Sequence, residues 1–129
     1  MATPFDNLSA AKYVNLETFR RDGRAVRTPV WIGGRDGKLY AFSKADAGKV
    51  KRVRGQGRVR LAPCTMGGRI TGEWAEGQAV QITRGDQTAR ARALLKAKYG
   101  LFGWITFSLF ASRDRAGIRA YLEITLDES

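Results

Sequence analysis

Hydrophobic and polar residues alternate along much of the chain with the two-residue period that is typical of β-strands. The clearest case is the segment 117–126, in which every second residue from Ile118 to Leu126 is apolar. We expect glycines at positions 72 and 77 to bend a long strand, as closure of a small barrel requires. The pattern predicts six strands, over 12–20, 25–33, 38–43, 58–64, 70–83 and 117–126. Turns are predicted at 21–23, 34–37 and 66–69.

Helical segments are predicted between these strands, because their composition favours helix or their apolar residues follow a helical period. Asp46 and Asp86 stand where the N-caps of two of these helices are expected, and Gly100 is a suitable helix stop. The last helix is apolar and aromatic, so we expect it to cover the barrel or a subunit interface. The predicted helices cover 5–11, 47–55, 87–99 and 101–112.

These elements predict one mainly β domain over residues 1–129, a six-stranded antiparallel barrel with flanking helices. The first eleven residues are mixed and polar, so no targeting signal is expected. The apolar stretch 101–111 is shorter than the roughly 20 residues that span a bilayer. Cys64 is the only cysteine, which fits a reducing cytosol, and we expect a buried, inert thiol in a cytoplasmic protein.

The absence of histidine excludes histidine-based triads and zinc sites with histidine ligands, and no metal site is predicted. Glu73 and Glu76 lie on one predicted strand, but their odd separation places them on opposite faces, so a pair of catalytic carboxylates is not expected. The motif Gly48-Lys49 is not a phosphate-binding P-loop, because Val50 follows where Ser or Thr would bind magnesium. No catalytic side chain is nominated, which favours chemistry carried by a cofactor.

The net charge of +11 has two interpretations, solubility alone or an anionic partner such as a phosphorylated cofactor, nucleic acid or membrane surface. One segment favours a phosphate. A predicted strand ends at Ser43 and Lys44, just before a helix that carries Lys49 and Arg52 on one face. A hydroxyl, cations and the free N–H groups of a helix start together favour an anion, although a solvated basic helix is the alternative.

Pro29 interrupts the predicted strand 25–33 and has no N–H to donate, so we expect it at a sheet edge, a bulge or a position that faces a ligand. Trp31, two residues later, is either an ordinary core aromatic or part of a ligand site.

The chain resembles the pyridoxamine 5'-phosphate oxidase-like split-barrel family, and more specifically its deazaflavin-dependent branch. The resemblance rests on RTPVWI, DGKLYAFS, AGKVKRVR and RVRLAPC in that order, and extends from 12–23 to 98–100. It implies a homodimer that holds FMN or the 8-hydroxy-5-deazaflavin coenzyme (F-420) at the subunit interface. It further implies transfer of a hydride between the cofactor and a small conjugated or heteroaromatic substrate.

The resemblance also implies residue roles. In the family, the strand that corresponds to Thr28, Pro29, Val30 and Trp31 runs beside the flavin-type ring, and Phe42, Ser43 and Lys49 match its phosphate-binding positions. The family often has arginine just before that lysine, where this chain has Gly48, so Arg52 or Lys44 is expected to replace the contact.

Two alternatives remain open. One is a basic single-stranded nucleic-acid-binding module of the OB type, with Trp31, Tyr40, Phe42 and Trp74 as stacking platforms, although nucleic acid is the less favoured partner. The other is a protein that binds the cofactor without turnover, which the sequence does not separate from an enzyme.

Overall fold

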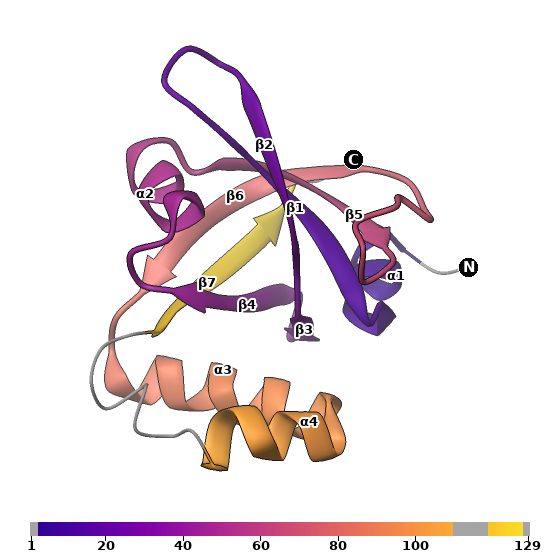
Figure 1. Ribbon diagram of the computed structural model, residues 1–129, viewed down its shortest axis with the longest axis vertical. Coiled ribbons are helices and arrows are strands. Elements are labelled where there is room, and N and C mark those ends of the chain that lie inside the picture. Colours follow the sequence, from indigo (N-terminus) through magenta and orange to yellow (C-terminus); the bar gives the residue numbers. More distant parts are fainter. Residues whose placement is uncertain (1–2, 110–118, 128–129) are drawn as a thin grey trace.

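Seven strands form one curled antiparallel sheet in the computed structural model, which describes residues 3–109 and 119–127 (Figure 1). Its spatial order is β2-β1-β5-β6-β7-β4-β3. The strands are β1 (Tyr13–Phe19), β2 (Ala25–Val30), β3 (Ile32–Arg35), β4 (Lys38–Lys44), β5 (Arg58–Cys64), β6 (Ala75–Ile82) and β7 (Arg119–Leu126). The mainly β, antiparallel prediction is confirmed, but the predicted number of six strands is wrong.

The extra strand arises because the segment predicted as one strand over 25–33 divides at Trp31. Its first part, β2, pairs with β1, and its second part, β3, pairs with β4. These two strands lie at opposite ends of the sheet order, although a single residue joins them. The sheet must therefore curl until its two edges approach each other at Trp31, which produces a barrel that is split along one side. Pro29 lies on β2, an edge strand, as its missing N–H predicted.

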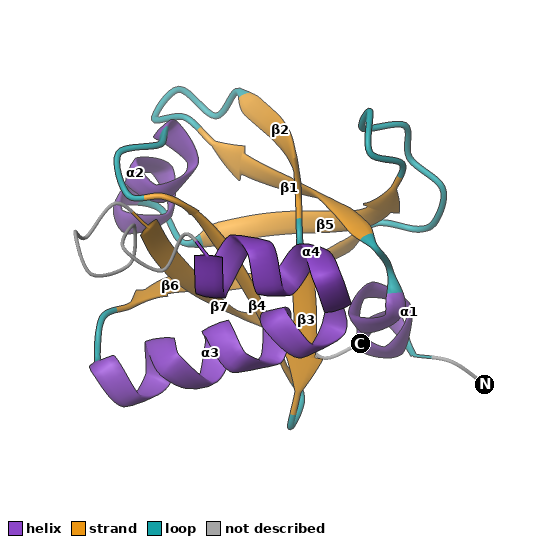
Figure 2. Ribbon diagram, turned by 60° about the horizontal axis from the view of Figure 1, so that its bottom comes forward, coloured by secondary structure: helices purple, strands orange, loops and turns teal. Residues whose placement is uncertain are grey.

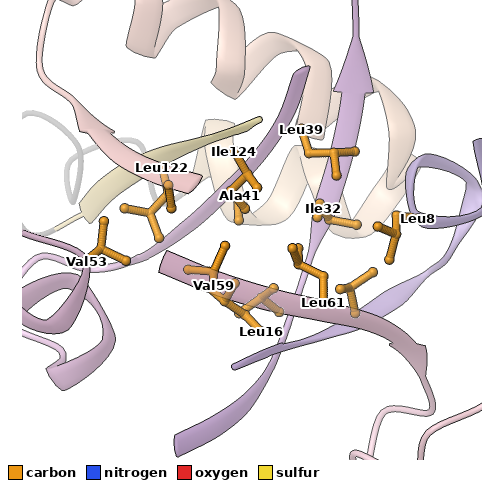
Figure 3. Close-up of a cluster of buried hydrophobic side chains, with 13 residues drawn as sticks. Leu8, Leu16, Ile32, Leu39, Ala41, Val53, Val59, Leu61, Leu122 and Ile124 are labelled. Atoms are coloured by element: carbon orange, nitrogen blue, oxygen red, sulfur yellow. The ribbon is translucent and has the colours of Figure 1, made fainter. Parts of the chain in front are cut away.

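The core fills the inside of this curled sheet (Figure 3). Alternate residues of the strands point inward, which is why the two-residue period was visible in the sequence. Helices α1 (Pro4–Ala10) and α2 (Gly48–Gly55) add Leu8 and Val53 to this cluster. The buried members are Leu8, Val14, Leu16, Val30, Ile32, Leu39, Ala41, Val53, Val59, Leu61, Ala79, Leu122 and Ile124.

The segment 70–83 was predicted as one long strand, and this was wrong for its first part. Strand β6 begins only at Ala75, and before it Ile70 makes a single bridge with Cys64. The residues between β5 and β6 form a loop that folds back against the sheet. Trp74 contacts two arginines of the sheet, and the Asn15 side chain donates a hydrogen bond to the Gly68 carbonyl. This packing accounts for the apolar residues of the loop, which imitate a strand in the sequence.

The N-caps were also assigned to the wrong residues. Ala47 precedes α2 without a side-chain cap, and Arg84 precedes α3 (Gly85–Lys98), so neither Asp46 nor Asp86 is an N-cap. Asp86 lies in the first turn of α3, where its negative charge still favours the helix N-terminus. The first helix begins one residue earlier than predicted, at Pro4, because Thr3 and Asp6 form a capping box.

Helix α3 ends before Gly100, which has a positive φ of 56° and was correctly predicted as the stop. The chain then continues as α4 (Gly100–Trp104) and a π-helix (Ile105–Leu109), and α4 lies alongside α3 (Figure 2). Gly103 permits this close approach, because a side chain there would collide with the backbone of Lys96. The ends of the predicted helix 101–112 and strand 117–126 fall partly outside the described residues. No helix in 3–109 or 119–127 is long and apolar enough to cross a membrane.

Candidate cofactor site

A cavity of about 300 Å³ lies where the corner between β2 and β3 meets the end of β4 and the first turn of α2. It brings together six of the nine residues that the sequence nominated for cofactor binding, namely Pro29, Val30, Trp31, Phe42, Ser43 and Lys49. The other lining residues are Tyr13, Met66 and Thr106. We call this the Lys49 cavity.

Aromatic rings form one side of the Lys49 cavity. Trp31 stacks face to face on Tyr99, with ring centroids 4.1 Å apart and planes 6° apart. Phe42 meets Trp31 edge to face at 6.0 Å and Phe107 in the same manner at 4.9 Å. Trp31 therefore packs against a second hydrophobic cluster while it also lines the cavity. It can be a core aromatic and part of a ligand site at the same time.

A hydroxyl and an ammonium form the polar side. Ser43 is 9% exposed and lies on β4 opposite Ala120 of β7. Lys49 lies in the first turn of α2, half-buried, and its pKa is lowered by burial and then by the positive charge of Arg52. None of the described residues that line the cavity carries a carboxylate, so no described lining group neutralises this ammonium. A bound anion would oppose both causes of the lowered pKa, because a nearby negative charge favours the charged form of the lysine.

The remaining three nominated residues do not line the cavity. Thr28 lies further along β2, where it pairs with Leu16 of β1. Lys44 is exposed at the end of β4. Arg52 turns away, because its Nε donates to the Thr18 hydroxyl of β1 at 2.6 Å.

Three lining residues were not foreseen. Tyr13 and Thr106 come from β1 and the π-helix, and Met66 comes from the loop between β5 and β6. The Met66 side chain is 73% exposed. A turn at 66–69 was predicted, but no local pattern indicates which strand such a turn will contact.

A buried ionic cluster holds the loop that carries Met66. Glu17 is 1% exposed and accepts hydrogen bonds from Arg27 at 2.7 Å and from Arg60 at 3.0 Å. The two guanidinium groups lie 4.8 and 4.7 Å from the ring centre of Trp74. Cation–π contacts of this kind attach the loop to the outer face of β1, β2 and β5. Asn15 adds a hydrogen bond of 2.9 Å to the Gly68 carbonyl.

A second, more apolar cavity of about 570 Å³ adjoins the first and shares Tyr13, Trp31 and Met66 with it. Its other lining residues are Ala10, Lys12, Lys98, Tyr99 and Phe102. Since Met66 belongs to both, it stands between a polar and an apolar compartment. We call the second compartment the Phe102 cavity.

Lys98 and Tyr99 attach the α3–α4 helices to the barrel at this point. The Lys98 ammonium donates to the carbonyls of Ser9 at 2.8 Å and Ala11 at 2.6 Å, and also to that of Ile32. Burial lowers the pKa of Lys98 to about 8. The Tyr99 hydroxyl accepts from the Ile32 N–H and donates to the Lys12 carbonyl, and burial raises its pKa to about 12.

Comparisons with known proteins define the fold. No model of a known protein family matches the chain, and no curated protein matches its sequence. Solved structures do match. HutZ, a heme storage protein from Vibrio cholerae, has a TM-score of 0.71 at 10% identity, with 92% of this chain and 83% of that chain covered. An FAD-binding protein from Mesorhizobium loti has a TM-score of 0.61 at 18% identity, with 95% and 84% covered.

A third solved structure, a candidate pyridoxamine 5'-phosphate oxidase from Listeria innocua, has a TM-score of 0.64 at 13% identity, with 94% and 88% covered. The fold is that of the pyridoxamine 5'-phosphate oxidase-like split barrels. At these identities the likeness concerns the fold alone. The proteins that share it include one named as a heme storage protein and one named as FAD-binding, so the fold does not decide between an enzyme and a binding protein.

Proposed function

We propose that this chain binds a flavin or deazaflavin cofactor and acts as an oxidoreductase on a small conjugated or heteroaromatic substrate. The observation that carries the proposal is the Lys49 cavity. Within the described residues, it combines an ammonium that has no hydrogen-bond or ion-pair partner and a buried hydroxyl with a wall of aromatic rings, and it has no acidic lining residue. A phosphate attached to a planar ring system matches both halves of this arrangement.

Within the cavity, Lys49 and Ser43 would hold the phosphate, aided by the N–H groups at the start of α2. Pro29, Val30 and Trp31 belong to the edge of the sheet, where backbone groups have no strand partner on one side and are free to contact the edge of a ring. When bound, the cofactor supplies the hydride chemistry for which the lining residues offer no acid–base pair. The chain's own contribution is to bind, orient and exclude water.

The choice between FMN and the F-420 deazaflavin follows the sequence resemblance, which favours the deazaflavin. The adjoining Phe102 cavity, with its apolar and aromatic lining, suits a planar acceptor that approaches the ring past Met66.

A homodimer is part of the proposal. At about 300 Å³ the Lys49 cavity is at the lower limit for ligand sites, which span roughly 300–1,000 Å³, so a second subunit is expected to complete it. Leu101 and Phe102 of α4 are 69% and 68% exposed, and Phe102 lines the same cavity as Met66, so these side chains offer an apolar surface for that subunit. Sedimentation analysis of the purified chain tests this, and a monomer at all concentrations would contradict it.

The nucleic-acid alternative is less favoured, because three of the four rings proposed as stacking platforms already have partners within the protein. Trp31 stacks on Tyr99, Phe42 packs against Phe107, and the Trp74 ring contacts two guanidinium groups. Binding of a cofactor without turnover uses the same cavity and has one specific support, the similar fold of a heme storage protein.

Fluorescence titration of the purified chain with FMN and with the F-420 deazaflavin tests cofactor binding. We expect saturable binding of at least one of them. If neither binds below high micromolar concentrations, the proposal fails. Reduced cofactor mixed with a panel of quinones and nitro-heteroaromatics then separates an enzyme from a binding protein, since only an enzyme accelerates reoxidation above the rate of free cofactor.

A further inference from the structure

A strongly basic cavity of about 690 Å³ lies on the other side of the first turn of α2, against the end of the β1–β2 hairpin. We call it the Arg20 cavity. Four of its lining side chains are cationic, namely Arg20, Arg21, Lys51 and Arg52. The remaining described lining residues are Phe19, Gly48, Gly55 and Gln56, so none of the lining residues that the structure describes is acidic.

No acidic residue in the described part of the chain forms an ion pair with these four cations. Among residues 3–109 and 119–127, every ion pair is formed by other basic residues, and the nearby Asp22 pairs with Arg24 instead. The pKa of Arg52 is lowered by burial and then by the charge of Arg20, so these groups repel each other. Such an arrangement costs stability unless an anion occupies it.

Consecutive residues at the start of α2 line this cavity and the Lys49 cavity. Gly48 lines one and Lys49, the next residue, lines the other. A side chain at Gly48 would begin only 2.7 Å from a terminal guanidinium nitrogen of Arg52. Glycine therefore allows Arg52 to fold back over the first turn of its own helix, where the bond to Thr18 fixes it.

We infer that the Arg20 cavity binds a second anionic group of the same cofactor, beyond the phosphate held at Lys49. This rests on the proposed function. FMN ends at one phosphate and leaves the four cations unused. A cofactor that continues past its first phosphate reaches them, either with a second phosphate, as in a flavin dinucleotide, or with a chain of carboxylates, as in the deazaflavin coenzyme. The cavity thus selects extended, multiply anionic cofactors over FMN.

The test compares four ligands on two variants. Arg20→Ala/Arg21→Ala removes two exposed cations of the cavity, and Arg54→Ala/Lys96→Ala removes two exposed cations that line neither cavity. The ligands are FMN, FAD, the deazaflavin with its carboxylate tail and the deazaflavin core without anionic groups, titrated by fluorescence at fixed salt.

We expect the Arg20/Arg21 pair to weaken FAD or the tailed deazaflavin by about 10-fold or more and FMN by less than about 2-fold, since only the former has charge-assisted bonds to lose. The control pair should change all affinities equally and slightly. The ligand that is weakened identifies the source of the anion. Equal weakening of FMN and the extended ligands, or no change in either, overturns the inference while the proposed function stands.

If none of the ring-bearing ligands binds the parent chain, the proposed function fails and the role of this cavity in holding the cofactor fails with it. Titration with pyrophosphate and with a triglutamate peptide then decides whether the cavity holds anions at all. Binding that the Arg20/Arg21 pair abolishes supports an anion site, and absent or unchanged binding overturns it.

Discussion

Two half-buried lysines, Lys98 and Lys49, occupy adjoining parts of the molecule and differ in what surrounds them. Lys98 donates to three backbone carbonyls and thereby fastens α3 to α1 and β3. Lys49 has no hydrogen bond or ion pair to any residue in the described part of the chain, and a nearby arginine repels it. The ammonium of Lys98 has all its hydrogen bonds within the protein, so its role is to hold the fold together. The ammonium of Lys49 has none in the described residues, and this contrast supports placing the phosphate at Lys49.

The largest expected effect comes from Lys98→Met, which keeps the apolar stem of the side chain and removes the three hydrogen bonds. Carbonyls of Ser9, Ala11 and Ile32 then lose a donor, and the free energy of unfolding should fall by about 2–4 kcal/mol. Urea denaturation measures it, with Lys96→Met as an exposed control two residues away. A loss below that of the control would mean that the three bonds add nothing to stability.

Lys49→Ala should weaken cofactor binding and leave the stability of the fold almost unchanged. Cofactor binding weakens by about 1.5–3 kcal/mol, or roughly 10- to 100-fold, because a charge-assisted bond to phosphate is lost. The free energy of unfolding changes by less than about 0.5 kcal/mol, since no protein partner is lost. Titration and urea denaturation of the same preparation check both statements. If the variant unfolds easily and binds normally, the contrast between the two lysines is wrong.

Trp74→Ala tests whether the position of Met66 in the Lys49 cavity depends on the ionic cluster of Glu17, Arg27 and Arg60. Without the indole ring that contacts Arg27 and Arg60, the loop that carries Met66 loses its cation–π contacts to the sheet. Trypsin should cleave after the exposed Arg69 several-fold faster than in the parent chain, since local opening controls proteolysis. Cleavage after Arg24, in the β1–β2 hairpin, should not change. Equal acceleration at both sites would indicate general destabilisation instead.

The smallest effect concerns pH. Burial lowers the pKa of Lys98 to about 8 from its ordinary value of 10.5, so between these pH values the unfolded chain holds a proton that the folded chain has released. The free energy of unfolding of the parent should therefore rise relative to Lys98→Met as pH increases from 8 to 10.5, by less than about 1.4 kcal/mol per pH unit because solvent screens the group. Parallel urea titrations at pH 7.5 and 10 measure the difference. A flat difference would show that the three carbonyls offset the effect of burial.

The sequence predicted the strands in which buried residues alternate with less buried ones, such as β4 and β5. It failed where the cause is not local. The division at Trp31 follows from the curl of the whole sheet, and the residues before Ala75 look like a strand because Trp74 packs against arginines from distant strands. The helix starts were misplaced because capping depends on backbone geometry, which composition does not specify.

The same distinction separates the parts of the candidate site. Ser43 and Lys49 were nominated together because a strand end followed closely by a helix start places them close. Met66 and Thr106 were missed because they reach the cavity from segments far along the chain. Arg52 was nominated for the Lys49 cavity but lines its neighbour, since the bond to Thr18 and the bare backbone at Gly48 decide which way it turns.

The single residue between β2 and β3 has a mechanical consequence. Trp31 is the covalent link between the two edge strands of the sheet, so the barrel opens when β2 and β3 move apart around it. A cofactor ring bound beside Trp31 would contact both edge strands and hold them together. Its affinity would then add directly to the resistance of the barrel against heat, and the indole of Trp31 would signal closure by its own emission.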